Sequence, residues 1–355
     1  MSVKEVENLI DVSGLKSYDL DPIPARILKG CKSTLLPTLT RIVNLSLQSA
    51  CLPGQLKEAM VMVRQKLKKE SLDFEQYSNF APISNLKFVS KIIERAVAAQ
   101  VKDYITDNDL DESLQSAYKR LHSTETALLI VQNDILCTID DNKCVALLLL
   151  DMSSAFDTVD HGLLLDRLCN RFGFKGQVLK WFESYLHNRK QFVMIDGVKS
   201  DVKNLQFRFS QGSVLGPILY SLYISLLGDI VRHHGLEFHL YAKDTQLYFA
   251  FRPIKAEQQS SLARIEACVS HVDSWLVRNK LKVNRGKTEL LILNASHRPR
   301  PPIEAIQVSS ERIMPVSSAR NIGVVFDQEV GSLRESSFNM TRGRDEDIET
   351  RSLKF

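Results

Sequence analysis

The chain has 355 residues, of which 44% are hydrophobic and 25% charged, and its formal net charge is only +4. These values are typical of a globular protein with one to three domains, and so small a net charge excludes any inference of a polyanionic partner from total charge alone. The six cysteines show neither a CxxC motif nor a Cys/His pair at zinc-binding spacing, so the sequence signals neither a disulfide framework nor a structural zinc site. This use of cysteine indicates a reducing compartment.

The first part of the chain is predicted to be mainly helical. Residues 1–56 look helical and polar to amphipathic, and Leu35–Leu47 has apolar residues at helical spacing. The first 14 residues carry acids and no long apolar run, which argues against a secretory signal. The basic segment Lys57–Glu70 has two interpretations, a solvated face or a phosphate-facing patch. We then expect a turn at Ala81–Asn85 and an amphipathic helix at Leu86–Tyr104.

A helix predicted at 125–140 leads to Val145–Asp160, the segment around which we expect the fold to be organised. Six apolar residues, rich in Val and Leu, predict a strand buried on both faces, and this run ends on Asp151. A carboxylate at the end of a core strand is costly unless it is solvated or paired with a cation. The segment is therefore either a solvated strand end with Asp160 capping the next helix, or a functional site.

The rest of the chain alternates short helices and strands. The predicted elements are helices at 163–172 and 179–186, strands at 192–195 and 205–209, an apolar helix at 214–231, a hairpin at 237–251 connected by Lys243-Asp244, a helix at 262–276, a strand at 281–293 containing a basic loop at 284–287, a linker at 297–302 and a strand at 321–326. The segment 214–231 raises the question of a membrane span, but Pro217, Asp229 and the lack of basic flanks favour a buried helix.

Two carboxylates stand at the ends of predicted strands. Asp151 ends the core strand, and Asp244 lies at the tip of the hairpin. If the two strands are neighbours, their tips form an oxygen-ligand site suited to Mg²⁺. Two Mg²⁺ ions about 3.5–4 Å apart can activate a hydroxyl and stabilise a leaving pyrophosphate, which is polymerase chemistry. Two acids on two strands are a weak pattern by themselves.

The chain resembles the reverse transcriptase of animal non-LTR retrotransposons, LINE-type elements of the CR1/L2/Jockey kind. The resemblance covers roughly residues 15–327, in the family's order, through the blocks APISNLKFVSKIIE, QSAYKRLHSTETALL, LLLLDMSSAFDTVDHGLLLDRL, SQGSVLGPILYSLYI, YAKDTQLY and WLVRNKLKVNRGKTELLIL. It implies an α+β fold, the right-handed polymerase, with helical fingers, an antiparallel palm sheet flanked by helices and an incomplete thumb. The implied regions are a helical N-terminal extension (1–56), fingers (57–144), palm (145–296), a linker and the end of the domain (297–327) and a disordered divergent tail (328–355), the reverse transcriptase domain being 79–327.

The resemblance also implies catalytic and metal-binding residues. Asp151 would bind both of two Mg²⁺ ions, with the carbonyl group of Met152 assisting, and Asp244 would be the second acid of the family's Tyr-x-Asp-Asp turn. Lys287 would lie near the pyrophosphate and give it a proton, although an ordinary surface lysine is an equal alternative. The implied partners are an RNA template, a DNA primer and dNTPs, with no membrane, in the nucleus and cytoplasm.

The nucleotide would be held by further residues that the resemblance assigns. The ring of Phe156 would exclude a 2′-hydroxyl group and so select dNTPs, the alternative being a core aromatic residue. Gln211 and Gly212 would contact the nucleotide and template, with the glycine allowing close backbone approach. Lys119 would grip the triphosphate, supplying charge without the bidentate fork of the usual arginine.

Departures from the family pattern point to an impaired enzyme. Lys243 stands where the first Asp of the Tyr-Ala-Asp-Asp turn is expected, Ser210 and Ala81 replace a proline and an arginine, and the tail after Phe326 leaves the pattern. The chain therefore looks like a truncated, partly degenerate copy. The alternatives are a catalytically dead nucleic-acid-binding remnant, in which Lys243 pairs with Asp151 in place of the metal, and a structural or interaction protein.

Overall fold

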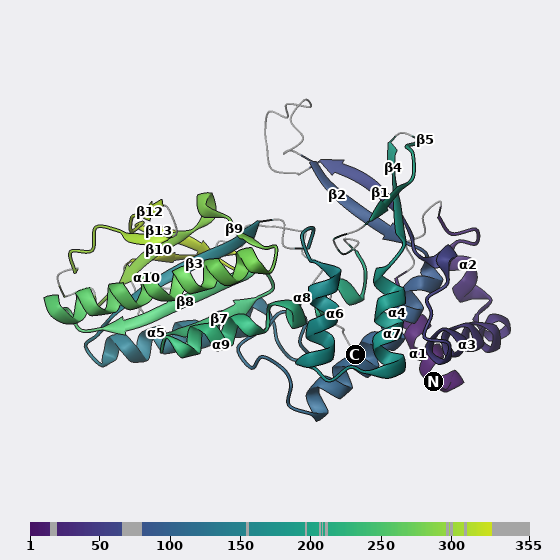
Figure 1. Cartoon of the computed structure of the whole chain (residues 1–355), viewed down its shortest axis with the longest axis horizontal. Helices are drawn as coiled ribbons and strands as arrows, with labels where there is room; N and C mark the ends of the chain where they lie inside the picture. Colours follow the sequence, from purple (N-terminus) through teal and green to yellow (C-terminus); the bar gives the residue numbers. More distant parts are fainter. Residues whose placement is uncertain are drawn as a thin grey trace. The chain divides into compact units, whose positions relative to one another are not determined.

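The computed structural model describes residues 1–14, 20–65, 80–153, 156–195, 197–205, 207, 209, 212–295, 298, 301–308 and 311–328. The chain divides into two compact units, each built from two separate stretches. Unit 1 comprises 1–111 with 156–224, and unit 2 comprises 112–155 with 225–355. Each unit holds its own five-stranded sheet flanked by helices, which confirms the predicted α+β class (Figure 1). The predicted fingers and palm each contribute to both units, and their boundaries stay a prediction.

Unit 1 is mainly helical. Its helices are α1 (Val3–Asp11), α2 (Ala25–Gly30), α3 (Lys32–Gln48), the 3-10 turn η1 (Gly54–Leu56), α4 (Phe88–Asp107), α6 (His161–Asn170), α7 (Gly176–Leu186) and α8 (Leu215–Ile224). Its strands are β1 (Glu58–Gln65), β2 (Phe80–Leu86), β4 (Arg189–Ile195), β5 (Val198–Lys199) and β6 (Lys203–Leu205). Their order is β2-β1-β4-β5, with β6 also paired to β4.

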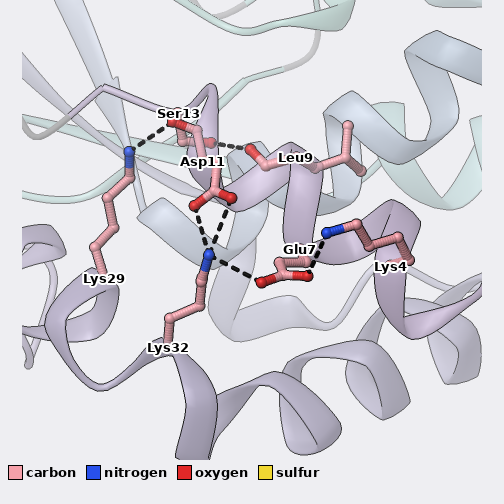
Figure 2. Close-up of polar contacts among 7 residues, drawn as sticks. All are labelled: Lys4, Glu7, Leu9, Asp11, Ser13, Lys29 and Lys32. Atoms are coloured by element: carbon pink, nitrogen blue, oxygen red, sulfur yellow. Dashed lines mark hydrogen bonds and ion pairs between the residues drawn. The ribbon is translucent and has the colours of Figure 1, made fainter.

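Helix α1 is held to the following helices by polar contacts (Figure 2). Ser2 and Glu5 form a capping box at its start. The ammonium group of Lys32, the first residue of α3, lies 3.0 Å from the carboxylate of Glu7 and 2.9 Å from that of Asp11. Ion pairs at the protein surface contribute little to stability, so these contacts orient α1 more than they stabilise it.

One prediction for unit 1 is wrong. The expected turn at Ala81–Asn85 lies within β2, because its backbone pairs with β1 over the full length of the strand. Strand pairing with a segment distant in sequence overrode the local turn preference of Pro and Asn. The basic segment Lys57–Glu70 overlaps β1, and its part beyond Gln65 lies outside the described residues, so its two interpretations stay predictions. The strand predicted at 205–209 is also shifted, since β6 ends at Leu205.

Unit 2 is organised around β3. Its helices are α5 (Thr124–Asp140), α9 (Leu226–His233), α10 (Lys255–Arg278) and the 3-10 turn η3 (Arg285–Lys287). Its strands are β3 (Cys144–Ser153), β7 (Glu237–Tyr241), β8 (Asp244–Phe251), β9 (Lys282–Val283), β10 (Glu289–Leu293), β11 (Ile306–Val308), β12 (Glu311–Ile313), β13 (Ser318–Asn321) and β14 (Val324–Asp327). The main sheet has the order β10-β3-β8-β7, all antiparallel, and β9 pairs with the end of β3.

The apolar run of β3 is buried on both faces, as predicted. Val145, Leu147 and Leu149 pack in one cluster with α5 and with the β13–β14 hairpin. Because side chains alternate along a strand, Leu148 and Leu150 point to the opposite face, where they are also buried. Helix α10 contacts β8, and α9 contacts β7. The core therefore holds β3 rigidly up to the residue where its apolar run ends.

Two later elements differ from their predictions. The apolar helix predicted at 214–231 is two helices, α8 and α9, which belong to different units. The stretch Leu215–His233 is long and apolar enough to cross a membrane, but 61% of its apolar window is buried inside the protein, as in a core helix. The last strand, predicted at 321–326, is the hairpin β13–β14, which packs on the β3 core.

Candidate active site

The two predicted catalytic carboxylates lie side by side. Asp151 on β3 and Asp244 on β8 are direct partners in the antiparallel ladder. Asp244 is the first residue of β8 and pairs with Tyr241, so the connection of the hairpin is Ala242-Lys243 and not Lys243-Asp244 as predicted. Ala242 has a φ of 54°, the left-handed conformation that a tight two-residue connection requires. The register between the strands therefore brings both acids to one end of the sheet.

Lys243 lies directly on Asp151. Its ammonium group donates a hydrogen bond to Oδ1 of Asp151 and lies 4.0 Å from Oδ1 of Asp244. The Asp151 side chain is only 11% exposed, whereas that of Lys243 is 40% exposed. A nearly buried carboxylate needs a partner charge, and here a lysine supplies it.

A second group of donors reaches Asp151 from the other side. Strand β9 pairs with the end of β3, with Val283 opposite Met152, and η3 follows it immediately. The side-chain amide of Asn284 donates to Oδ2 of Asp151 at 3.3 Å, and its backbone N–H donates to the Asp151 carbonyl at 2.7 Å. The ammonium group of Lys287 lies 3.4 Å from Oδ2. Both carboxylate oxygens of Asp151 therefore contact nitrogen donors.

Asp244 is in a different electrostatic environment. Burial raises its pKa above the ordinary value, and the neighbouring charge of Asp151 acts in the same direction. Lys243 and Lys287 oppose this shift because each favours the ionised carboxylate. Two carboxylates held this close together are characteristic of a site in which a cation compensates their negative charge.

The residues at this position do not fit two Mg²⁺ ions. A divalent ion needs free carboxylate oxygens, and those of Asp151 are occupied by Lys243 on one side and by Asn284 and Lys287 on the other. Within the described part of the chain, no group of three or more His, Cys, Asp or Glu side chains is arranged to hold a metal ion. The lysine that replaces the expected acid acts as the counter-ion of Asp151.

The comparisons with known proteins identify the family of the chain. The family described as reverse transcriptase (RNA-dependent DNA polymerase) matches residues 55–326, most of the chain. The chain belongs to the reverse transcriptase family. This confirms the predicted family, and with it the polymerase type of fold.

The relatives of this reverse transcriptase domain are polymerases of mobile elements. It is 28% identical over 280 residues to a probable RNA-directed DNA polymerase from transposon BS of Drosophila melanogaster, covering 77% of this chain and 30% of the relative. The RNA-directed DNA polymerase from mobile element jockey of the same organism is 28% identical over 290 residues, covering 78% and 30%. The chain thus spans about a third of the length of its curated relatives. An apo telomerase from Candida tropicalis, truncated from its C-terminal domain, has a TM-score of 0.49 and 12% identity, covering 87% of this chain and 60% of that one.

Other predicted residues of the reverse transcriptase site have their own contacts within unit 2. Met152 is buried at the end of β3, opposite Val283. The ammonium group of Lys119 donates to the carbonyl oxygen of Glu112 at 2.9 Å. An ammonium group has three N–H donors, so this bond leaves the predicted role of Lys119 on the triphosphate open, and that role stays a prediction.

Three nucleotide-binding predictions fall in or near unit 1. The ring of Phe156, which is half-buried, lies 4.8 Å from that of Tyr220, and its carbonyl accepts the N–H of Phe209. Its predicted role in excluding a 2′-hydroxyl group stays a prediction. Gly212 has a φ of 103°, and an added Cβ would lie 2.6 Å from the carbonyl oxygen of Ser84. The close approach predicted for Gly212 is therefore made to β2. Gln211 lies outside the described residues.

The surroundings of two further residues, Lys57 and Asn284, depend on contacts with segments distant in the sequence. Lys57, the start of the predicted basic patch, is buried, and its ammonium group lies 3.3 Å from the carbonyl oxygen of His187 and 3.4 Å from Oγ of Ser184, both in unit 1. It is therefore unavailable to phosphate. In the sequence Asn284 stands out only as part of a basic loop, although it contacts Asp151 twice. A polar residue directly after the buried Val283 was the signal that could have singled it out.

Proposed function

We propose that the chain is an RNA-directed DNA polymerase domain of a retrotransposon in which Lys243 impairs nucleotidyl transfer. The domain would join dNTPs to the 3′-hydroxyl group of a DNA primer on an RNA template, with Mg²⁺, the ion its family uses. The observation that carries the proposal is the contact between Lys243 and Asp151. The ligand set for two metal ions has lost one acid, and the remaining central acid is paired with a fixed cation.

Electrostatics gives the size of the effect. Each unit-charge pair at about 4 Å is worth roughly 4 kcal/mol at an effective dielectric constant near 20. Replacing an aspartate by Lys243 changes the charge by two units beside Asp151 and Asp244, and the ammonium group also lies where a bridging ion would bind. A divalent ion must displace it from Asp151, so metal affinity should fall by orders of magnitude.

The test is primer extension on an RNA template with Mg²⁺ or Mn²⁺. We expect little synthesis by the unaltered chain and more by Lys243→Asp, which restores the family's acid. Binding of Mn²⁺, followed by its electron paramagnetic resonance signal, should tighten in the same variant. A matched control is Lys143→Asp, which makes the same charge change at a residue of unit 2 that is 37% exposed and pairs with Asp141 at 3.3 Å. Robust synthesis by the unaltered chain would refute the impairment.

A second candidate function is nucleic-acid binding without catalysis. The observation in its favour is that Lys243 compensates the negative charge of Asp151 without a metal ion. The sheet would then stay folded, and the strand ends that carry Asp151 and Asp244 would be less negative. Exposed bases at Lys282 and Lys287 lie beside the same strand end. Binding through phosphates would weaken with salt, with a logarithmic slope of about −0.9 for each phosphate contacted on duplex DNA.

Fluorescence anisotropy with a labelled RNA–DNA hybrid at several salt concentrations tests this candidate. Salt-dependent affinity, together with no synthesis by either the unaltered chain or Lys243→Asp, would favour the non-catalytic function. An affinity that does not change with salt would argue against it. Synthesis restored in Lys243→Asp would instead favour an impaired polymerase.

A further inference from the structure

The segment before α5 contacts strand β7 of the β7–β8 hairpin through an isolated parallel bridge. The backbone N–H of Leu240, on β7, donates to the Leu114 carbonyl at 2.8 Å, and the N–H of Ser116 donates to the Leu240 carbonyl at 3.0 Å. Gln115, between them, forms a parallel bridge with Leu240. Its backbone is thus fixed against the strand that leads into the Ala242-Lys243 connection.

The Gln115 side chain reaches the connection itself. It is buried, with 4% of the residue exposed, and its Oε1 accepts the N–H of Ala117 at 2.9 Å and that of Ala242 at 3.1 Å. Both partners are N–H donors, which fixes the oxygen, and not the nitrogen, as the atom that faces them. Among the described residues the Gln115 Nε2 has no hydrogen-bond partner, so the oxygen is the part of the amide that is used.

Ala242 needs this support because of its backbone conformation. It is a non-glycine residue in the left-handed region, with a φ of 54°, a conformation that costs of order 1 kcal/mol or more unless its surroundings stabilise it. Its side chain packs with Ala117 and Tyr241. The hydrogen bond from Ala242 to Gln115 holds the connection in this conformation, and the next residue is Lys243.

We propose that Gln115 is a positioning residue, whose side-chain oxygen holds the Ala242-Lys243 connection so that Lys243 reaches Asp151. It contacts neither substrate nor metal and acts only through the connection. The same bond would place an aspartate at position 243 beside Asp151 in the Lys243→Asp variant. The inference rests on the proposed role of Lys243 for its functional meaning, but its structural part can be tested without any synthesis.

The experiment is amide hydrogen exchange with mass spectrometry on the full chain, comparing Gln115→Met with Gln246→Met. Methionine has nearly the same length as glutamine but lacks the acceptor. Gln246 is the matched control, because it is a buried glutamine of β8 whose side-chain oxygen accepts a hydrogen bond from Asn321 and not from the connection. We expect exchange at Ala242 to rise about tenfold in Gln115→Met, as for loss of one buried hydrogen bond, and to stay near the original rate in Gln246→Met.

A second readout is the reactivity of the lysines toward acetic anhydride. Lys243 should become severalfold more reactive in Gln115→Met, because it is no longer held on Asp151, whereas Lys143 should not change. Equal exchange at Ala242 in both variants, or unchanged reactivity of Lys243, would overturn the proposal. If Gln115→Met does not fold, the coupling across the hydrogen bond between the Ala242 nitrogen and the Gln115 Cδ, measured by NMR in the unaltered protein, decides: its presence supports the proposal and its absence refutes it. Failure of Lys243→Asp to restore synthesis would count against the proposed function and leave these results intact.

Discussion

The stability of an Asp151→Asn variant shows whether Asp151 is paired with lysine or belongs to a group of carboxylates that need a metal ion. In a cluster of metal-binding acids, removing one carboxylate relieves repulsion, so the metal-free protein becomes more stable. In this structure Asp151 is the partner of Lys243 and Lys287, and its loss leaves both ammonium groups without their carboxylate. We therefore expect Asp151→Asn to lower the free energy of unfolding of unit 2. The sign of the change is the diagnostic result.

The magnitude follows from the contacts. A buried hydrogen bond to a charged group is worth about 1.5–3 kcal/mol, whereas an exposed ion pair contributes at most about 1 kcal/mol. Asp151 is nearly buried, but Lys243 is 40% exposed and Lys287 is 67% exposed, which reduces both terms. Relief of the repulsion from Asp244 offsets part of the loss. We expect a net destabilisation of about 1–2 kcal/mol.

Urea unfolding in the presence of a chelator measures this change. Trp275 lies in unit 2 and Trp181 in unit 1, so fluorescence in a Trp181→Phe background reports unit 2. Asp141→Asn is the control, since it removes an exposed carboxylate paired with Lys143, and it should change stability by less than about 0.5 kcal/mol. An Asp151→Asn variant as stable as the unaltered chain, or more stable, would refute the reasoning.

Three other predictions concern residues outside the Asp151 site. Glu94 is buried and accepts the first N–H groups of α8 at 2.7 and 3.2 Å, so Glu94→Ala should destabilise unit 1 by about 2–4 kcal/mol in urea unfolding, and a change below about 1 kcal/mol would contradict this. Gly212→Ala should destabilise more than Gly197→Ala, because both have positive φ but only Gly212 would place its Cβ against a carbonyl oxygen; equal effects would contradict it. Burial lowers the pKa of His239 to about 4 from the usual 6.5, so the unfolded chain binds a proton that the folded chain does not. Stability should therefore fall by up to about 3 kcal/mol as pH drops from 6.5 toward 4, less steeply in His239→Asn, and an unchanged slope would refute the assignment.

Much of the site could be predicted from the sequence, because its signals are local. The apolar run that ends on Asp151 has the pattern of a strand buried on both faces, and burial makes the charge at its end conspicuous. The order of the family blocks then assigned Asp244 as the second acid and identified Lys243 as a substitution. The hypothesis that Lys243 pairs with Asp151 followed from charge alone, and the contact confirms it.

Tertiary structure decided what local patterns do not contain. Strand register placed Asp151 opposite Asp244, 93 positions apart in the numbering, and shifted the hairpin connection by one residue. The turn after β9 brought Asn284 and Lys287 to Asp151. A hydrogen bond from the backbone of Ala242 brought the Ala242-Lys243 connection into contact with Gln115. Hydrogen bonds between distant segments set these positions, whereas a sequence pattern records only the face on which each residue lies. The residues of the site were therefore readable in the sequence, but the strand register and the hydrogen bonds that bring them together were not.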